Sequence, residues 1–181
     1  MKRIRILGLD CGSTQAGISV LDVLDDGRLW EVKEACVSRF QPRFTFPQRI
    51  AQLAQVAADA IELWEPSAIV IEDIKFNKGN KFLGAMGKVA MAIGGVMVAV
   101  SNAGYNPVII TATQARGKIK AKTKDAARAT LNKRFAEDLC KLGYPEGVPK
   151  AKEDITDALV LCYAAYIPII NDPDLYILPG T

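Results

Sequence analysis

Short apolar runs alternate with polar turns along the first forty residues. Ile4 to Asp10 (IRILGLD) predicts a strand, and Gly17 to Val23 (GISVLDV) predicts its hairpin partner after the turn CGST. The turn DDG then leads to a third predicted strand, Leu29 to Ser38. The chain is therefore expected to open with a three-strand antiparallel meander.

The apolar spacing changes to a helical period after residue 44. The segment TFPQ at 45–48 predicts a capping box with proline in the first turn, and the apolar positions that follow predict an amphipathic helix ended by Pro66. Ala68 to Ile71 is an unbroken apolar run, which is typical of a strand buried on both faces. A helix followed by such a strand implies a right-handed crossover.

The remaining pattern predicts further helices and one more strand. A Gly/Ala/Met-rich helix over about 83–103 precedes a strand at 108–111. The segment 112–142 begins with a basic connection and becomes a helix that stops at Gly143, and a last helix covers about 153–166. We expect one domain over 1–167 and an irregular tail over 168–181, where Pro, Asn and Asp alternate.

Four acidic residues lie at positions that are typical of a catalytic or metal-binding site. Asp10 and Glu72 close predicted strands, where a mixed sheet presents its reactive edge, while Asp154 and Asp157 are spaced i, i+3 and share one helix face. Together they could hold hard divalent cations. Each acid also has a structural interpretation, as a turn residue or as a first-turn partner of the helix dipole. Glu153 is an alternative to Asp154 as the ligand.

Composition narrows the chemistry. The chain has 181 residues, half of them hydrophobic, which suits one core, and its net charge of +3 by itself implies no polyanion partner. Histidine is absent, which excludes Ser-His-Asp and Cys-His catalysis and histidine-ligated zinc. Carboxylates favour Mg²⁺ or Mn²⁺ instead.

Cysteine usage and hydropathy indicate a reduced cytoplasmic protein. The four cysteines are scattered without a C-x-x-C pair. The first apolar run is broken by Asp10, so it is no signal-peptide core. The apolar run 89–100 is too short to span a bilayer, and we therefore expect no membrane role.

Three segments together resemble the motifs of RuvC-type Holliday junction resolvases: LGLDCGS at 7–13, VIE at 70–72 and DITDAL at 154–159. The resemblance runs from about residue 3 to residue 165. It implies an α/β ribonuclease H-like fold, with a mixed five-stranded sheet made of the meander plus two crossover strands and flanked by helices. The compact chain would suit a phage or mobile-element enzyme.

The resemblance also implies an activity. A structure-specific endodeoxyribonuclease would cleave four-way DNA junctions with two Mg²⁺ ions per site, which Mn²⁺ is expected to replace, and with no organic cofactor. Phosphodiester hydrolysis needs an activated water and a stabilised leaving oxyanion, and two metal ions can supply both. Our hypothesis is that Asp10 bridges both ions, that Glu72 and Asp157 complete one site each, and that Asp154 is a further ligand or orients the water.

Basic residues follow the strands that lead to these acids. They are candidates for phosphate contacts with DNA: Lys75, Lys78, Lys81, Arg116, Lys118, Lys120, Lys122 and Lys124. By resemblance, Arg116 and Lys124 match the family's active-site basic residues. Phe76 could stack on unpaired bases at a junction centre, or it could simply anchor its loop to the core.

The helix over 83–103 is rich in small residues, which let helices approach closely. The resemblance to these resolvases implies a homodimer joined through this helix. The alternative is a central helix buried within the monomer.

Other function classes stay open at this point. The sequence DCGST at 10–14 also suits the phosphate hairpin of actin-like or sugar-kinase ATP-binding proteins, but these need a second domain for which the chain has no room. A non-catalytic junction-binding module is expected to lose at least one acid. A ribonuclease H-like nuclease acting on RNA/DNA, flaps or other branches is not separated from a resolvase by the sequence.

Overall fold

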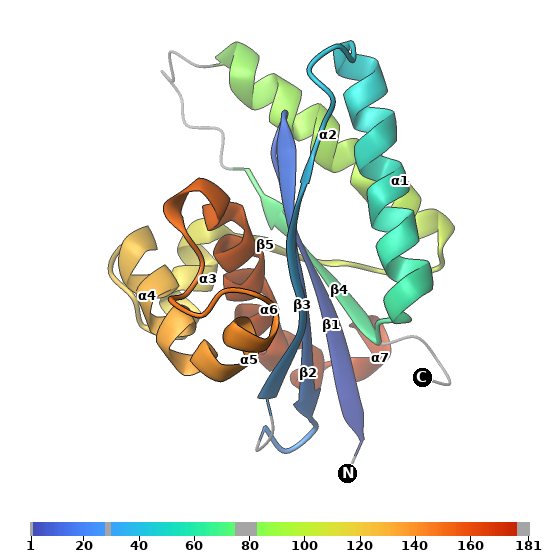
Figure 1. The fold of residues 1–181 in the computed structure, drawn as a ribbon. Coiled ribbons are helices and arrows are strands. Elements are labelled where there is room, and N and C mark those ends of the chain that lie inside the picture. The colour runs from blue at the N-terminus through green and yellow to red at the C-terminus, as the bar shows by residue number, and fades with distance from the viewer. Residues whose placement is uncertain (1, 28–29, 75–82, 177–181) are drawn as a thin grey trace.

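The computed structural model of the chain describes residues 2–27, 30–74 and 83–176 (Figure 1). The strands are β1 (Arg3–Cys11), β2 (Gln15–Leu24), β3 (Trp30–Arg39), β4 (Ala68–Asp73) and β5 (Val108–Thr111). The helices are α1 (Phe46–Trp64), α2 (Leu83–Asn102), α3 (Ala112–Ile119), α4 (Lys124–Arg134), α5 (Ala136–Lys141), α6 (Glu153–Asn171) and α7 (Pro173–Tyr176), with a 3₁₀ turn η1 (Lys150–Lys152) before α6.

The five strands form one mixed sheet in the order β3-β2-β1-β4-β5. The pairs β1/β2 and β2/β3 are antiparallel, whereas β1/β4 and β4/β5 are parallel. The expected meander with two crossover strands is therefore confirmed.

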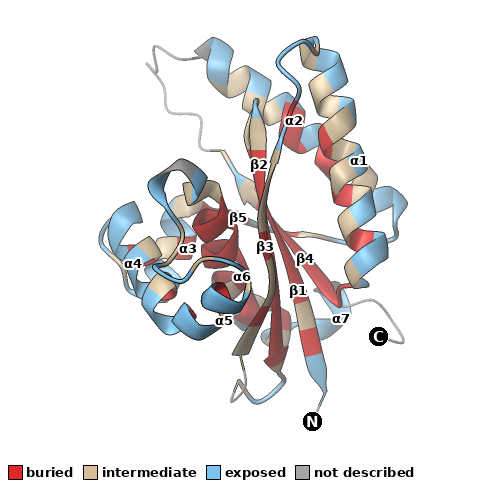
Figure 2. Ribbon diagram, viewed as in Figure 1, coloured by how far each residue is buried: buried red, intermediate tan, exposed pale blue. Residues whose placement is uncertain are grey.

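Helices cover both faces of this sheet (Figure 1). On one face α6 packs across all five strands and is flanked by α3 and α4, while α5 lies against β3. On the other face α1 and α2 pack on each other and against β1 and β4. Each face has its own apolar core, centred on residues such as Leu21 and Leu159 on the α6 side and Leu53 and Ile71 on the α1 side. Figure 2 shows the burial concentrated in the central strands and α6.

The segment 112–142 differs from the prediction because its basic beginning is helical. Thr111 caps α3: its hydroxyl accepts from the Gln114 backbone N–H (3.2 Å), and the Gln114 side chain accepts from the Thr111 N–H (2.9 Å). Lys120, in the left-handed conformation with φ 60°, then ends α3. The result is three short helices in place of a connection and one helix. The T-x-x-Q capping box was the signal for the first of them.

The expected irregular tail is also wrong up to residue 176. Helix α6 continues through Pro168 to Asn171, and α7 follows at once. Proline removes one N–H from the helix and crowds the carbonyl four residues before it, but the next residue, Ile169, is fully buried, so core packing holds this last turn in place. Residues 177–181 lie outside the described part of the chain.

Helix α2 is longer than its apolar run suggested. The stretch Gly84–Asn102 has the length and composition of a membrane-crossing helix, so the expectation that it is too short is wrong. Length and composition alone are weak evidence for a span, and one side of α2 packs against α1 and the sheet. Only 22% of the stretch is buried, so the alternative of a central helix enclosed in the monomer is wrong too.

An ion pair between half-buried Arg5 and buried Asp22 ties the start of β1 to β2. The Asp22 side chain is 1% exposed and accepts from Arg5 Nε (2.8 Å) and Nη2 (3.0 Å), while Arg5 Nη1 donates to the Trp64 carbonyl (2.9 Å). Arg5→Ala leaves a buried carboxylate without its main partner, and we expect a loss of about 3 kcal/mol or more in the free energy of unfolding. For a chain of this size that lowers the melting temperature by roughly 10 °C, measured by circular dichroism.

The matched control is Arg3→Ala. Arg3 is 54% exposed and lies 3.6 Å from Asp22, so its loss is expected to cost less than about 1 kcal/mol. Equal melting temperatures for the two variants would contradict the assignment of Arg5 as the principal partner of Asp22.

Candidate functional site

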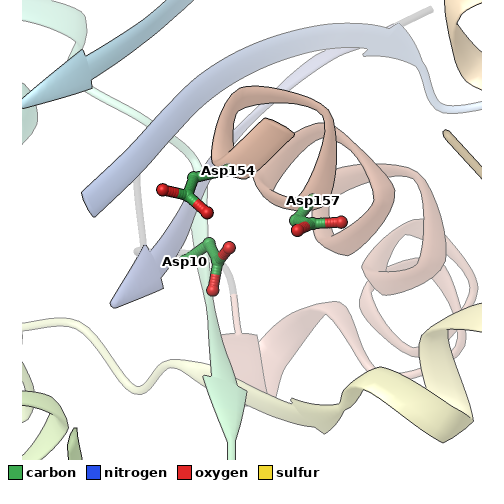
Figure 3. A group of neighbouring side chains, drawn as sticks. All are labelled: Asp10, Asp154 and Asp157. Carbon is green, nitrogen blue, oxygen red and sulfur yellow. The ribbon is translucent and has the colours of Figure 1, made fainter. Parts of the chain in front are cut away.

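The acids that the sequence singled out meet at one edge of the sheet. Asp10 is near the end of β1, Asp154 and Asp157 are in the first turns of α6, and one carboxylate oxygen of each lies within 4.8 Å of the others (Figure 3). Leu9 pairs with Ile71 across β1 and β4, which puts Asp10 beside Glu72, and the two carboxyl groups share a hydrogen bond. The structure thus gathers Asp10, Asp154 and Asp157 into one group and places Glu72 beside Asp10.

Two glycines allow α6 to approach the sheet closely enough for this. A Cβ at Gly17 in β2 would lie 1.9 Å from the Asp154 carbonyl oxygen, and one at Gly8 in β1 would lie 2.5 Å from that of Ala158. Ser19 adds a hydrogen bond from its hydroxyl to the Ile155 carbonyl (3.0 Å). The absence of side chains at Gly8 and Gly17 therefore sets how closely the first turns of α6, which carry Asp154 and Asp157, pack against the sheet.

The electrostatics of the cluster favour a cation. Burial, the hydrogen bond and charge of Glu72, and the charges of Asp157 and Asp154 raise the pKa of Asp10 well above its ordinary value. Carboxylates that repel one another in a half-buried site are stabilised when a divalent ion neutralises them. The donor set consists of oxygens alone, which fits a hard cation such as Mg²⁺.

Two of the acids are held by neighbouring side chains. Gln15, the first residue of β2, donates its side-chain N–H to Asp154. Arg128 donates to both oxygens of Asp157, from Nε to Oδ1 (2.9 Å) and from Nη2 to Oδ2 (2.7 Å), and Lys124 Nζ lies 2.7 Å from the same Oδ2. These contacts fix how the carboxylates are oriented.

Asp154 and Glu153, the two alternatives for the fourth acidic ligand, have different surroundings in the structure. Within the described residues, the group that could share a metal ion consists of Asp10, Asp154 and Asp157. The Glu153 carboxylate instead pairs with Arg128 Nη1 at 2.6 Å. Glu153 therefore supports the site from outside the cluster.

The predicted basic residues divide into three groups. Arg116 and Lys124 line a small pocket together with Glu72 and Asp157, so they face the acids. Burial alone would lower the pKa of Lys124, but its hydrogen bond to Asp157 and the charges of Asp157 and Asp10 outweigh burial and raise it, so this side chain stays cationic. Lys118, Lys120 and Lys122 are exposed on α3 and the connection after it. The third group, Lys75, Lys78 and Lys81, lies outside the described residues, as does Phe76, the predicted stacking residue.

Gln15, Gly17 and Arg128 are not among the site residues that the sequence predicted. Lys124 and Arg128 are spaced i, i+4 at the start of α4, and this spacing places both on one helix face, so the shared face was a usable signal. Gln15 is 139 residues from its partner, and the sequence carries no signal for that pair.

A family model and several known proteins match this chain, some of them over most of its length. A family model described as Crossover junction endodeoxyribonuclease RuvC matches residues 6–163. A RuvC of Geotalea uraniireducens is 30% identical over 165 residues, covering 89% of this chain and 88% of the relative. A RuvC of Xanthomonas euvesicatoria is 35% identical over 74 residues, covering 41% of this chain and 42% of the relative.

Two solved structures share the fold. The Thermus thermophilus RuvC in complex with a Holliday junction substrate superposes with a TM-score of 0.71 at 19% identity, covering 97% of this chain and 99% of that one. A Fowlpox virus resolvase in complex with substrate Holliday junction DNA gives a TM-score of 0.59 at 10% identity, covering 90% and 99%. These likenesses confirm the ribonuclease H-like architecture expected for the mixed sheet.

Proposed function

Because the chain belongs to the RuvC family of crossover junction endodeoxyribonucleases, we propose that it resolves four-way DNA junctions by hydrolysing one phosphodiester in each of two strands. The observation that carries this proposal is the convergence of Asp10, Asp154 and Asp157, with Glu72 beside Asp10, at the carboxyl edge of β1 and β4. A binding module without catalysis would have no need for four mutually repelling acids at one point.

The site is proposed to hold two Mg²⁺ ions, with Mn²⁺ as a working substitute. Asp10 is the natural shared ligand, because it contacts Glu72 and feels the charges of both aspartates of α6. Glu72 and Asp157 would each serve one ion, and Asp154, which Gln15 holds, would be a further ligand or would orient the attacking water. When bound, such ions polarise the phosphate and favour ionisation of water near neutral pH.

The cations around the site are proposed to hold DNA by its backbone. Arg116 and Lys124 line the same small pocket as Glu72 and Asp157, and they would neutralise the phosphate next to the scissile bond. Lys118, Lys120 and Lys122 are exposed and would add phosphate contacts further along the strand. Contacts of this kind position the duplex without reading its sequence, and they weaken steeply with added salt.

The substrate class is tested by cleavage of synthetic DNAs of matched sequence. We expect four-way junctions to be cut in both of a symmetry-related pair of strands with Mg²⁺ or Mn²⁺, and no cutting in EDTA. Three-way junctions, flaps, linear duplex and RNA/DNA hybrid are the comparison substrates. A preference for flaps or for RNA/DNA would replace the resolvase proposal with that of a broader ribonuclease H-like nuclease.

Paired cutting calls for two active sites, and α2 offers the surface for a homodimer. Met91 is 62% exposed and Val98 is 60% exposed, and a Cβ at Gly87 or Gly94 would meet nothing within 4 Å. Residues 87, 91, 94 and 98 follow the alternating three- and four-residue spacing of a helix-packing seam. A second copy of the chain would cover these side chains and let the backbones approach closely.

The dimer is tested with Met91→Glu and light scattering. Wild-type protein at micromolar concentration should have twice the 19.6 kDa mass of the chain, and the variant should have the mass of one chain, because a charge in an apolar seam opposes association. Leu63→Glu is the control, since Leu63 is 73% exposed on α1 and not part of the seam. A monomeric wild type would remove the dimer proposal.

We place the enzyme in the cytoplasm. Its four cysteines are free, and burial raises the pKa of the Cys11 and Cys162 thiols far above the ordinary value, which suits inert packing in a reducing compartment.

A further inference from the structure

Arg128, in helix α4, contacts an unusual number of acidic side chains. Its side chain is 12% exposed, and its nitrogens contact three different acids. Nε and Nη2 take one oxygen each of Asp157, and Nη1 lies 2.6 Å from Glu153 and 3.6 Å from the exposed Asp125. Arg128 therefore joins α4 to the first turns of α6 at the point where one of the four clustered acids emerges.

We propose that Arg128 is a positioning residue for Asp157, and that its planar fork fixes which oxygen of this carboxylate is offered to a divalent cation. The inference rests on the proposed function, because it requires Asp157 to be a metal ligand. It assigns a role to a side chain that need touch neither DNA nor metal.

The geometry of the fork limits what Asp157 can offer. A carboxylate has about four lone-pair sites, and Arg128 occupies one on each oxygen while Lys124 occupies a second on Oδ2. The site that stays available is on Oδ1. Arg128 is itself held in place, because it pairs with Glu153 as well as with Asp157. Asp157 thus presents one defined oxygen without having to be reoriented.

The positive charge of Arg128 does not cancel the acid that it holds. Glu153 pairs with the same guanidinium at 2.6 Å, so the cation is already matched by a carboxylate outside the cluster. Four acids, Asp10, Glu72, Asp154 and Asp157, therefore keep an excess of negative charge for a divalent ion. Hydrogen-bonding partners behind ligating groups typically contribute a factor of about 10 to 100 in metal affinity or activity.

The position requires arginine in particular. Lysine would keep the charge, but its single ammonium cannot form two parallel bonds to one carboxylate and a third to Glu153. The anchoring of α4 supports the same geometry, because Ala127 and Leu131 on either side of Arg128 are buried in the core and hold its backbone in place.

The test measures Mn²⁺ binding to the whole protein without DNA, by calorimetry and by the electron paramagnetic resonance signal of free Mn²⁺. Arg128→Lys and Arg128→Gln should both weaken the Asp157-dependent binding, by about 10-fold or more, and slow cleavage in parallel. Binding of a four-way junction without divalent ions should stay within about twofold. Lys133→Gln, an exposed cation on the same helix, is the charge control and should bind Mn²⁺ as the wild type does.

Glu153→Gln provides a second route that leaves Arg128 in place. Without the Glu153 carboxylate, Arg128 is held less firmly, so Mn²⁺ binding should weaken as it does in Arg128→Lys. The double variant should lose less Mn²⁺ affinity than the sum of the two single losses, because both changes act through the Arg128 guanidinium. Additive effects would overturn the proposal.

Two outcomes distinguish failure of the positioning role of Arg128 from failure of the proposal that Asp157 is a metal ligand. Unchanged or tighter Mn²⁺ binding in Arg128→Lys, with Asp157→Asn still reducing it, would overturn the positioning role alone and make Arg128 a competing counter-ion. Binding that is indifferent to Asp157→Asn would remove Asp157 from the metal site, and both proposals for this residue would then fail together.

Discussion

Asp10→Asn is expected to lower the rate of junction cleavage by about 10³-fold or more and to leave junction binding almost unchanged. The amide keeps the size of the side chain but loses the negative charge that a shared cation requires, and losing several kcal/mol of metal-ion stabilisation corresponds to a change of this size. Phosphate contacts come from other side chains, so affinity for DNA should persist.

Single-turnover cleavage and gel-shift binding measure the two effects separately. Asp73→Asn is the matched control, because Asp73 ends β4 next to Glu72 but is exposed. It should cleave at nearly the wild-type rate. A fully active Asp10→Asn protein would refute the assignment of the cluster as the catalytic centre.

The same substitution should stabilise the metal-free fold. The pKa of Asp10 is raised in the folded state, so the folded protein binds its proton more tightly than the unfolded chain does. Between the unfolded value, near 3.8, and the raised folded value, stability then falls as pH rises, and at higher pH the whole penalty is present. In EDTA at neutral pH, Asp10→Asn should therefore melt above the wild type, whereas Mg²⁺ should stabilise the wild type more than the variant.

The parts of the fold that the sequence predicted are those with local signals. The meander has alternating apolar runs and glycine or aspartate turns, and β4 is an unbroken apolar run, so each could be recognised from its own residues. The last turns of α6 could not, because Pro168 argues locally for a stop while the burial of Ile169 is a property of the packed core. Helix α3 was hidden by its charges, although Thr111 and Gln114 carried a cap signal.

The candidate site divides in the same way. Acids at strand ends and an i, i+3 pair on a helix are local patterns, and their convergence follows from the topology of a mixed sheet. Their orientation depends on long-range contacts: Gln15 reaches Asp154 from β2, and Arg128 reaches Asp157 from α4. A sequence read position by position supplies the candidate ligands but not the residues that orient them.

The site also requires α6 to pack closely against β2, and Gly17→Ala tests this requirement. The added Cβ would lie 1.9 Å from the Asp154 carbonyl oxygen and 3.0 Å from its Cβ. Backbone cannot yield as a side-chain tip can, so α6 must shift outward and carry both aspartates with it. We expect a loss of about 1 to 3 kcal/mol in the free energy of unfolding, from overpacking, and a fall in cleavage of about 10²-fold, since a shift near 1 Å is enough for such an effect.

Cleavage must be measured well below the melting temperature of the variant, so that the folded fraction does not limit the rate. The control is Gly117→Ala in α3, where an added Cβ meets nothing within 4 Å and alanine favours the helix by up to about 1 kcal/mol. If Gly17→Ala folds and still cleaves junctions at the wild-type rate, the acidic turn of α6 tolerates displacement, and the close approach at Gly17 serves packing alone. Weakened Mn²⁺ binding together with slow cleavage would instead tie the glycine in β2 directly to the geometry of the metal site.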